Sequence, residues 1–274
     1  MIEYEIKPVN KLSVNFKELW DFKELFYFFT WRDIKVKYKQ TILGFLWAIL
    51  QPALMMIIFT FLFGNLLNTQ SKVTVPYPVF VYTGLMFWNI FSSGLQNAGN
   101  SMVSNASIIK KIYFPRLIIP LSSILISLFD FLMTLLLYSV LLIYYQVEIS
   151  WYRLLLCFPL ALIITVLTTF GVGTFLAALN IKYRDFRYII PFMVQVLMFV
   201  SPVIYPVNII QNKWLQLAFN LNPLNSALIL ARSVIDSSPI NWLQTCVGLL
   251  FALFWLLIGV LYFRKTESHF ADLA

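Results

Sequence analysis

The sequence predicts an all-α membrane protein that crosses the bilayer six times. Of the 274 residues, 60% are hydrophobic and only 12% are charged, whereas an average soluble domain has roughly 25% charged residues. A soluble fold of this size cannot bury so much apolar surface, so we expect the surplus to face lipid. The apolar residues also form six runs, each long enough to cross about 30 Å of hydrocarbon as a helix.

The six predicted spans follow one another along the chain. They are Phe45–Leu67, Tyr77–Gln96, Leu117–Tyr145, Leu154–Asn180, Tyr188–Tyr205 and Leu243–Phe263. This division predicts an N-terminal segment (1–43), a transmembrane domain (44–263) and a C-terminal tail (264–274). Because Met1–Pro8 lacks the charged, apolar and small-residue regions of a signal peptide, we expect the N-terminal segment to stay attached.

The distribution of Lys and Arg predicts that both termini are cytoplasmic. If the N-terminus is inside, 16 of the 20 basic residues fall in inner segments, and four are outside: Lys72, Arg153, Lys213 and Arg232. Cytoplasmic loops carry such an excess of positive charge. The net charge of +8 could also indicate nucleic-acid binding. However, the basic residues separate apolar spans and form no single soluble face, so we expect them to contact membrane lipids and no nucleic acid.

The N-terminal segment contains a predicted amphipathic helix from Phe16 to Phe29. Its apolar residues fall on one broad face, opposite Lys17, Asp21 and Glu24. This pattern is typical of a helix that lies in the membrane interface. The alternative is a surface helix that packs on its own protein.

Two short apolar stretches lie between the fifth and sixth spans, in residues 207–241. Trp214–Phe219 and Leu224–Val234 are each too short to cross a bilayer. We expect two short re-entrant helices on the outer side, packed against protein so that their backbone groups are satisfied. The alternative is a full hairpin with eight spans in total, although Pro223 and neighbouring Asn residues interrupt it.

The residues expected of a membrane enzyme are missing from the sequence. The single His, His269, lies near the C-terminus, and Cys157 and Cys246 lack metal-ligand spacing, so we expect free, membrane-buried thiols and neither a disulfide nor a metal site. Gly94–Ser101 has the glycine spacing of a phosphate-binding loop, but Asn100 stands where the Lys would be. We interpret this segment as a helix end with coincidental glycines. The chain is therefore expected to be a passage or carrier without its own cofactor.

Polar residues form stripes on two of the predicted spans. One stripe in the second span comprises Tyr82, Asn89, Ser93 and Gln96, and one in the third comprises Ser123, Ser127, Asp130, Thr134 and Tyr138. Asp130 is the one acidic residue deep within a span, where a carboxylate is costly unless it is paired or hydrated. The stripes indicate either a hydrated path or adhesion between helices. The small residues of the fourth span, such as Gly171 and Gly173, indicate close helix packing.

Four sequence blocks resemble a known family. The stretch W-R-D-I-K-V-K-Y-K-Q-T-I-L-G-F-L-W-A-I-L-Q-P, from Trp31 to Pro52, is similar to the start of the first span in ABC-2 type permeases that export polysaccharides. Asn180–Arg187, Ser201–Pro206 and Asn222–Asn225 match later motifs in order and spacing. Together the blocks extend over nearly the whole chain.

The resemblance implies a permease subunit in the bacterial cytoplasmic (inner) membrane, part of an ATP-driven exporter of lipid-linked polysaccharide such as O antigen, capsule or teichoic acid. It implies a homodimer that pairs with two separate ATPase subunits, which bind ATP and Mg, so that the chain itself is not an enzyme. The residues implied to couple to the ATPase are Arg32, Asp33, Lys35, Lys37, Asn100 and Ser101. The alternatives are an ABC-2 exporter of a small drug or lipid, or an enzyme acting on polyprenyl lipids.

The same interpretation predicts where the substrate would pass. Aromatic rings can stack on sugars without fixing their order, and amides and carboxylates can bind hydroxyl groups. The predicted path residues are Tyr38, Trp47, Gln51, Tyr82, Trp88, Asn89, Gln96 and Asp130. Lys110, Lys111 and Arg116 are predicted to contact a lipid-diphosphate headgroup, unless they are ordinary positive-inside anchors.

Overall fold

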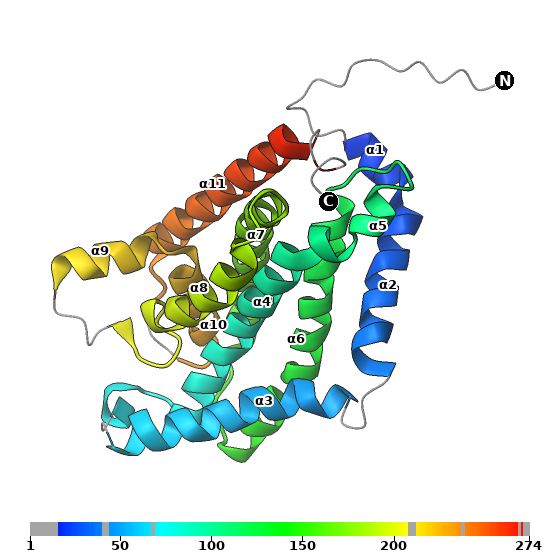
Figure 1. Ribbon diagram of the computed structural model, residues 1–274. Coiled ribbons are helices and arrows are strands. Elements are labelled where there is room, and N and C mark those ends of the chain that lie inside the picture. The colour runs from blue at the N-terminus through cyan, green and yellow to red at the C-terminus, as the bar shows by residue number, and fades with distance from the viewer. Residues whose placement is uncertain are drawn as a thin grey trace.

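The computed structural model describes residues 16–39, 44–66, 69–207, 212–236, 239–267 and 270. Within these residues every regular element is a helix, which confirms the all-α prediction (Figure 1). The N-terminal residues before Phe16, and His269 in the tail, lie outside the described residues. The helices in chain order are α1 (Phe16–Asp21), α2 (Lys23–Lys39), α3 (Gly44–Phe59), η1 (Thr60–Leu66), η2 (Thr69–Lys72), α4 (Tyr77–Ser104), α5 (Ala106–Ile109), α6 (Ile118–Tyr144), α7 (Trp151–Lys182), α8 (Phe186–Val200), α9 (Lys213–Leu221), α10 (Pro223–Arg232) and α11 (Trp242–Glu267).

Four helical stretches in the described part of the chain are long and apolar enough to cross a membrane. They are Gly44–Gly64, Ile118–Tyr144, Trp151–Lys182 and Trp242–Glu267, and they coincide with the first, third, fourth and sixth predicted spans. The chain is therefore a multi-pass membrane protein.

The helices that contain the second and fifth predicted spans differ from expectation in length. α4 has 28 residues and continues past the predicted end at Gln96 to Ser104. α8 has 15 residues and ends at Val200, five residues before the predicted end at Tyr205. Ser201 has an extended backbone (φ −94°, ψ 140°) because the following residue, Pro202, disfavours helical geometry in the residue before it.

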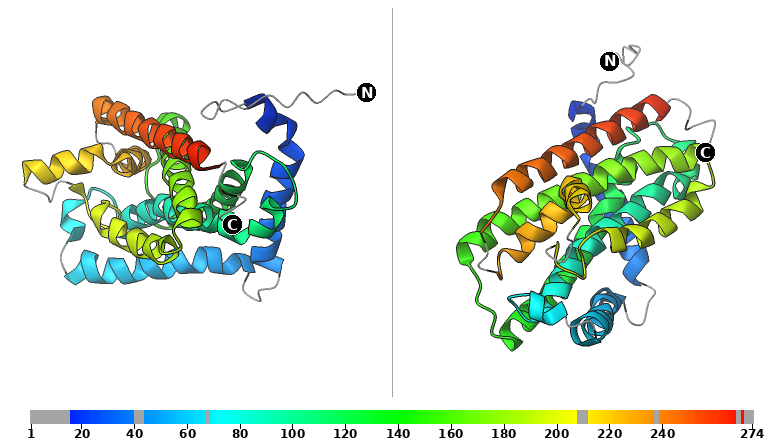
Figure 2. Two further views of the ribbon diagram at one scale, coloured as in Figure 1. Left: turned by 45° about the horizontal axis from the view of Figure 1, so that its top comes forward. Right: turned by 90° about the vertical axis from the view of Figure 1, so that its left-hand side faces the viewer.

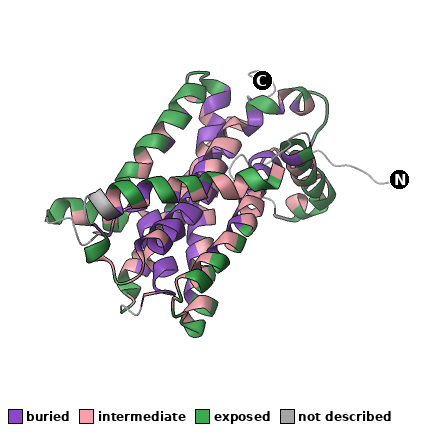
Figure 3. Cartoon of the chain, turned by 90° about the horizontal axis from the view of Figure 1, so that it is seen from below, coloured by how far each residue is buried: buried purple, intermediate pink, exposed green. Residues whose placement is uncertain are grey.

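α4 lies at the centre of the bundle. It packs between α6 and α7, and α11 covers the other side of α7 (Figures 1 and 2). Most α4 side chains are buried, as the purple interior of Figure 3 shows. Because α4 is enclosed by protein, it can carry polar residues that a lipid-facing helix could not. Large apolar side chains on α3, α8 and α11 instead point outward, such as Ile57, Phe192 and Leu257.

Small residues allow α7 and α11 to touch through their backbones. A Cβ atom added at Gly259 would lie 1.9 Å from the carbonyl oxygen of Gly171, and one added at Gly171 would lie 2.4 Å from the backbone nitrogen of Leu256. On another side of α7, a Cβ at Gly173 would lie 2.9 Å from the Cβ of Ala98 in α4. The predicted close packing of the fourth span is confirmed.

The predicted N-terminal segment is helical, but the helix is divided and longer than predicted. α1 and α2 meet at Phe22, and α2 continues ten residues beyond Phe29, to Lys39. Phe29 is buried, with its ring centroid 5.7 Å from that of Phe114. Trp20, in contrast, is 71% exposed. The helix therefore packs on its own protein along α6 (Figure 1). It also exposes aromatic side chains.

Two short helices, α9 and α10, occupy the region between the last two predicted spans. Neither is long enough to cross a bilayer, at nine and ten residues. α10 is buried against α7 and α11, whereas α9 projects at the left of Figure 1. The guanidinium of Arg232, which is 8% exposed, donates to the carbonyl oxygens of Pro202 (2.9 Å) and Val203 (2.5 Å), so it joins α10 to the turn after α8.

The two Cys residues differ in burial. Cys157 is buried in the core and Cys246 is exposed on the surface of the chain, and both are free thiols. Cys246 lies in α11, one of the four helical stretches long enough to cross a membrane, so its location in the membrane stays a prediction.

Candidate functional site

A cavity of about 750 Å³ lies between α2, α3, α4 and α6. Two of its walls come from the polar stripe on α4 and from the first half of α3. The lining residues are Lys37, Tyr38, Gly44, Trp47, Ala48, Gln51, Pro52, Asn89, Ser92, Ser93, Gln96, Asn97, Asp130 and Thr134. Six of the eight predicted path residues are among them, although the sequence positions span almost one hundred residues.

Amide and hydroxyl groups dominate the polar part of this lining. Asn89, Ser93 and Gln96 lie three or four positions apart, so they share one face of α4. The hydroxyl of Ser93 donates to the carbonyl oxygen of Asn89 within the helix, at 2.5 Å. Side-chain amides offer both donors and acceptors, and Trp47 adds an aromatic face. Such a lining suits a ligand with many hydroxyl groups.

Asp130 of α6 is paired at the edge of the cavity. Its carboxylate accepts hydrogen bonds from the ammonium of Lys37 and from the phenol of Tyr38, both at the end of α2. The pairing offsets the cost of a carboxylate at this depth. Burial, and then the contact with Asp130, raise the pKa of Tyr38, so its phenol stays a donor. Asp130 lines the cavity and also attaches α2 to α6. Its position is therefore compatible with both interpretations of the polar stripe, a hydrated path and adhesion between helices.

Two predicted path residues lie outside this cavity. Tyr82 is fully buried two turns from Asn89, where its phenol donates to the carbonyl oxygen of Thr134 at 3.0 Å and its ring stacks on Tyr138. Tyr82 therefore mediates helix packing, because α6 closes over α4 at that level. Trp88 lines a neighbouring cavity of about 220 Å³, which shares Gln51, Asn89, Ser92 and Gln96 with the first and extends to α8.

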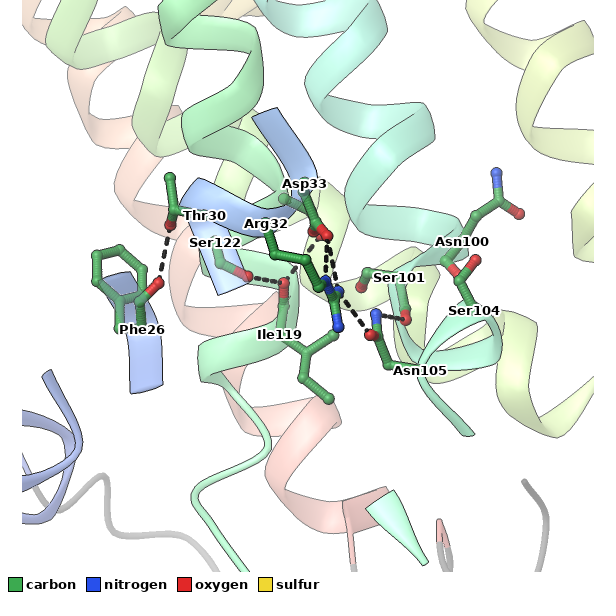
Figure 4. Close-up of polar contacts among 11 residues, drawn as sticks. Phe26, Thr30, Arg32, Asp33, Asn100, Ser101, Ser104, Asn105, Ile119 and Ser122 are labelled. Atoms are coloured by element: carbon green, nitrogen blue, oxygen red, sulfur yellow. Dashed lines mark hydrogen bonds and ion pairs between the residues drawn. The ribbon is translucent and has the colours of Figure 1, made fainter. Parts of the chain in front are cut away.

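Three of the predicted coupling residues meet where α2 crosses the end of α4 (Figure 4). The guanidinium of Arg32 donates to Asp33 (2.8 Å) and to the side-chain oxygen of Asn105 (2.9 Å). The amide of Asn105 donates in turn to the carbonyl oxygen of Ser101, at 2.8 Å. Asn105 was not predicted from the sequence, where an Asn at a helix end is typical of an ordinary cap.

The other three coupling candidates are dispersed. The side chain of Asn180 in α7 donates to the side-chain oxygen of Asn100 at 3.1 Å, so Asn100 joins α4 to α7. Lys35 lies over the ring of Trp31 on the outer surface of α2, with 5.3 Å between its ammonium and the ring centroid. Lys37 lines the cavity, and the structure therefore groups it with the path residues.

The three cations predicted to hold a headgroup do not form one cluster. Lys110 and Lys111 are exposed in the connection between α5 and α6. Arg116 is half-buried and donates through its backbone and guanidinium to Glu267 at the end of α11. The guanidinium donates to the backbone carbonyl oxygen of Glu267, and the backbone N–H of Arg116 donates to its carboxylate.

The segment Gly94–Ser101 is a continuous part of α4, which confirms that it is helical and not a phosphate-binding loop. Its glycines serve packing: a Cβ at Gly94 would lie 2.5 Å from a methyl carbon of Thr169. Within the described residues, no three His, Cys, Asp or Glu side chains come together as metal ligands would.

Comparison with known proteins gives one family. Residues 24–235 match the ABC-2 type transporter family. Similar proteins include the O-antigen export system permease protein RfbA of Klebsiella pneumoniae, 30% identical over 96% of this chain and 98% of the relative. The protein of the same name from Myxococcus xanthus is 27% identical over 92% and 96%, and the polysialic acid transport protein KpsM of Escherichia coli is 24% identical over 86% and 91%.

The matched region extends from the start of α2 to the end of α10. It contains the residues that line the cavity and the contacts of Arg32 and Lys37. Because the match covers most of the chain, and relatives align over nearly their full length, the chain belongs to the ABC-2 type transporter family.

Proposed function

We propose that this chain is the permease subunit of an ATP-driven exporter that moves lipid-linked polysaccharide, such as O antigen, capsule or teichoic acid, across the bacterial cytoplasmic membrane. The observation that carries the proposal is the cavity between α2, α3, α4 and α6, which is lined by amides, hydroxyls and an indole. The names of the relatives, two O-antigen export permeases and a polysialic acid transporter, support this substrate class.

The chain crosses the membrane six times, through α3, α4, α6, α7, α8 and α11. α1, α2, α5 and the end of α11 gather on one side of the bundle, and α9 lies on the opposite side (Figure 1). The first side carries most of the Lys and Arg residues, which supports a cytoplasmic location for it and for both termini. α9 and α10 are then short outer helices, and α8 is a short span continued by the turn at residues 201–206.

ATP hydrolysis comes from two separate ATPase subunits that bind ATP and Mg, and they work with two copies of this chain. The helical conformation of Gly94–Ser101 supports this division of labour, because a helix cannot wrap around a triphosphate. The contact of Arg32 with Asn105 supports force transfer through α2, since it joins α2 directly to the cytoplasmic end of α4.

The polar groups of the cavity also argue against the alternative function, export of a small apolar drug or lipid. A buried polar group that a ligand leaves without a hydrogen bond costs free energy, so a cavity that presents several amides disfavours an apolar ligand. In this cavity the residues Gln51, Asn89, Gln96 and Asn97 present four amides to one space.

Genetic complementation in cells, together with an ATPase assay on the purified proteins, tests the proposal. The chain and an ATPase subunit of the same transporter family are expressed in cells that lack their own exporter, and surface polysaccharide is measured by antibody binding. We expect surface glycan only when both are present, and ATP turnover only in the purified complex. Robust ATP hydrolysis by the chain alone, or glycan export without a nucleotide-hydrolysing partner, would contradict the proposal.

A further inference from the structure

The charged groups of the cavity form a single pair. Among its lining residues within the described chain, Lys37 is the one cation and Asp130 the one anion. The two differ in access: the side chain of Lys37 is 42% exposed, and that of Asp130 is 15% exposed. The ammonium is therefore the member of the pair that a ligand in the cavity reaches first.

Asp130 has a second donor that does not depend on Lys37. The phenol of Tyr38 donates to the other carboxylate oxygen. The Tyr38 ring is held by stacking on Phe45, with centroids 4.6 Å apart, and by a tilted contact with Phe129 at 5.6 Å. When Lys37 leaves, the carboxylate keeps this hydrogen bond, which lowers the cost of separating the pair.

The bond from Tyr38 also keeps α2 attached to α6 when the pair separates. Three long-range polar contacts join α2 to the bundle: one from Arg32 to Asn105 near α4, and one each from Lys37 and Tyr38 to Asp130 on α6. The Lys37 ammonium can therefore change its partner while Arg32 and Tyr38 hold the helix in place.

We propose that Lys37 exchanges partners during loading: the diphosphate of a polyprenyl-linked cargo replaces Asp130 on the Lys37 ammonium, while Asp130 keeps its hydrogen bond from Tyr38. The inference rests on the proposed function. The diphosphate that joins a polyprenyl chain to a glycan carries one negative charge on each of its two phosphates, so it competes well with one carboxylate for a compact ammonium on a flexible stem. Lys110, Lys111 and Arg116 lie outside the cavity lining, and Arg116 is already bound to Glu267.

Partner exchange predicts opposite effects for the two members of the pair. In Lys37→Met the phosphate loses its partner, and binding weakens. In Asp130→Asn the competing charge is gone, and binding tightens. If the ion pair were purely structural, both substitutions would weaken binding of the phosphate by similar factors.

The binding test uses the full-length chain in phosphatidylcholine nanodiscs, with undecaprenyl phosphate as the probe. We expect Lys37→Met to weaken binding about tenfold, Asp130→Asn to tighten it severalfold, and Lys37→Arg to bind within about threefold of the parent. Lys35→Met is the matched control, because it removes a cation from the same helix but on the outer surface. Its affinity should stay within about twofold of the parent.

Two results would overturn the assignment. One is an equal loss in Lys35→Met and Lys37→Met, which indicates general attraction to a basic surface. The other is weaker binding in Asp130→Asn. Phosphatidic acid and inorganic phosphate distinguish the source of the phosphate: equal affinity for either, relative to undecaprenyl phosphate, would overturn the assignment to a polyprenyl cargo.

The binding measurement does not require translocation, so a failure of polysaccharide export would leave its outcome readable.

Discussion

Gly259→Ala tests whether the contact of α7 with α11 depends on bare backbone. The added Cβ atom would lie 1.9 Å from the carbonyl oxygen of Gly171, whereas ordinary contact begins at about 3.4 Å. The two helices must therefore separate by roughly 1.5 Å at the crossing. A gap of 0.5–1 Å already removes a quarter to a half of the dispersion energy of a contact, and neither backbone can move aside as a flexible side chain does.

The expected loss follows from two opposing contributions. Overpacking costs about 3 kcal/mol, at the upper end of the usual range, because the clash is with backbone. Ala favours a helix over Gly by about 1 kcal/mol. The net loss is about 2 kcal/mol, which lowers the folding equilibrium constant roughly 30-fold.

Unfolding of the purified protein in detergent, followed by circular dichroism, measures this loss. Gly99→Ala is the matched control, because its Cβ would meet the terminal carbon of the Ile190 side chain at 2.7 Å, with the next contacts at 3.7 Å. A flexible side-chain end can rotate away, so we expect Gly99→Ala to be as stable as the parent. Equal stability of Gly259→Ala and the parent would refute the proposed backbone contact.

Three further predictions concern the cavity and its surroundings. Ser93→Trp places an indole in the cavity and should abolish export while ATP hydrolysis by the complex continues; normal export would exclude this cavity from the path. Arg32→Ala should increase hydrogen exchange in α2 by loss of the bond to Asn105, worth about 1.5–3 kcal/mol for a charged donor, and Asn105→Ala should match it without adding to it in the double variant. Tyr82→Phe removes the bond to Thr134 and should cost about 1 kcal/mol of stability with export unchanged; an export defect in a fully stable variant would return Tyr82 to the path.

Much of the site was predictable from residue type and spacing. Asn89, Ser93 and Gln96 share a helical face by spacing alone, and Asp130 stood out because carboxylates are rare at that depth. The sequence could not reveal that Tyr82, on the same stripe, would be covered. That depends on where α6 approaches α4, which is decided by contacts between residues about fifty positions apart.

Lys37 shows why adjacent residues can belong to different sites. Lys35 and Lys37 are two positions apart in one basic run, so the same role was predicted for both from the sequence. In a helix, two positions correspond to a rotation of about 200°, and α2 packs on α6 with one side only. One lysine therefore faces the outside over Trp31 and the other enters the cavity.

The sequence by itself determined that the chain is helical and embedded in a membrane. A sufficiently long apolar run can cross a bilayer as a helix, whichever other segments it contacts. It also indicated that the fourth span packs closely, since only small residues permit backbone contact. The tertiary structure decided that α4 is a central, protein-covered helix and that α2 ends in a cavity wall. Those properties arise from contacts between distant segments, and no local window of sequence contains them.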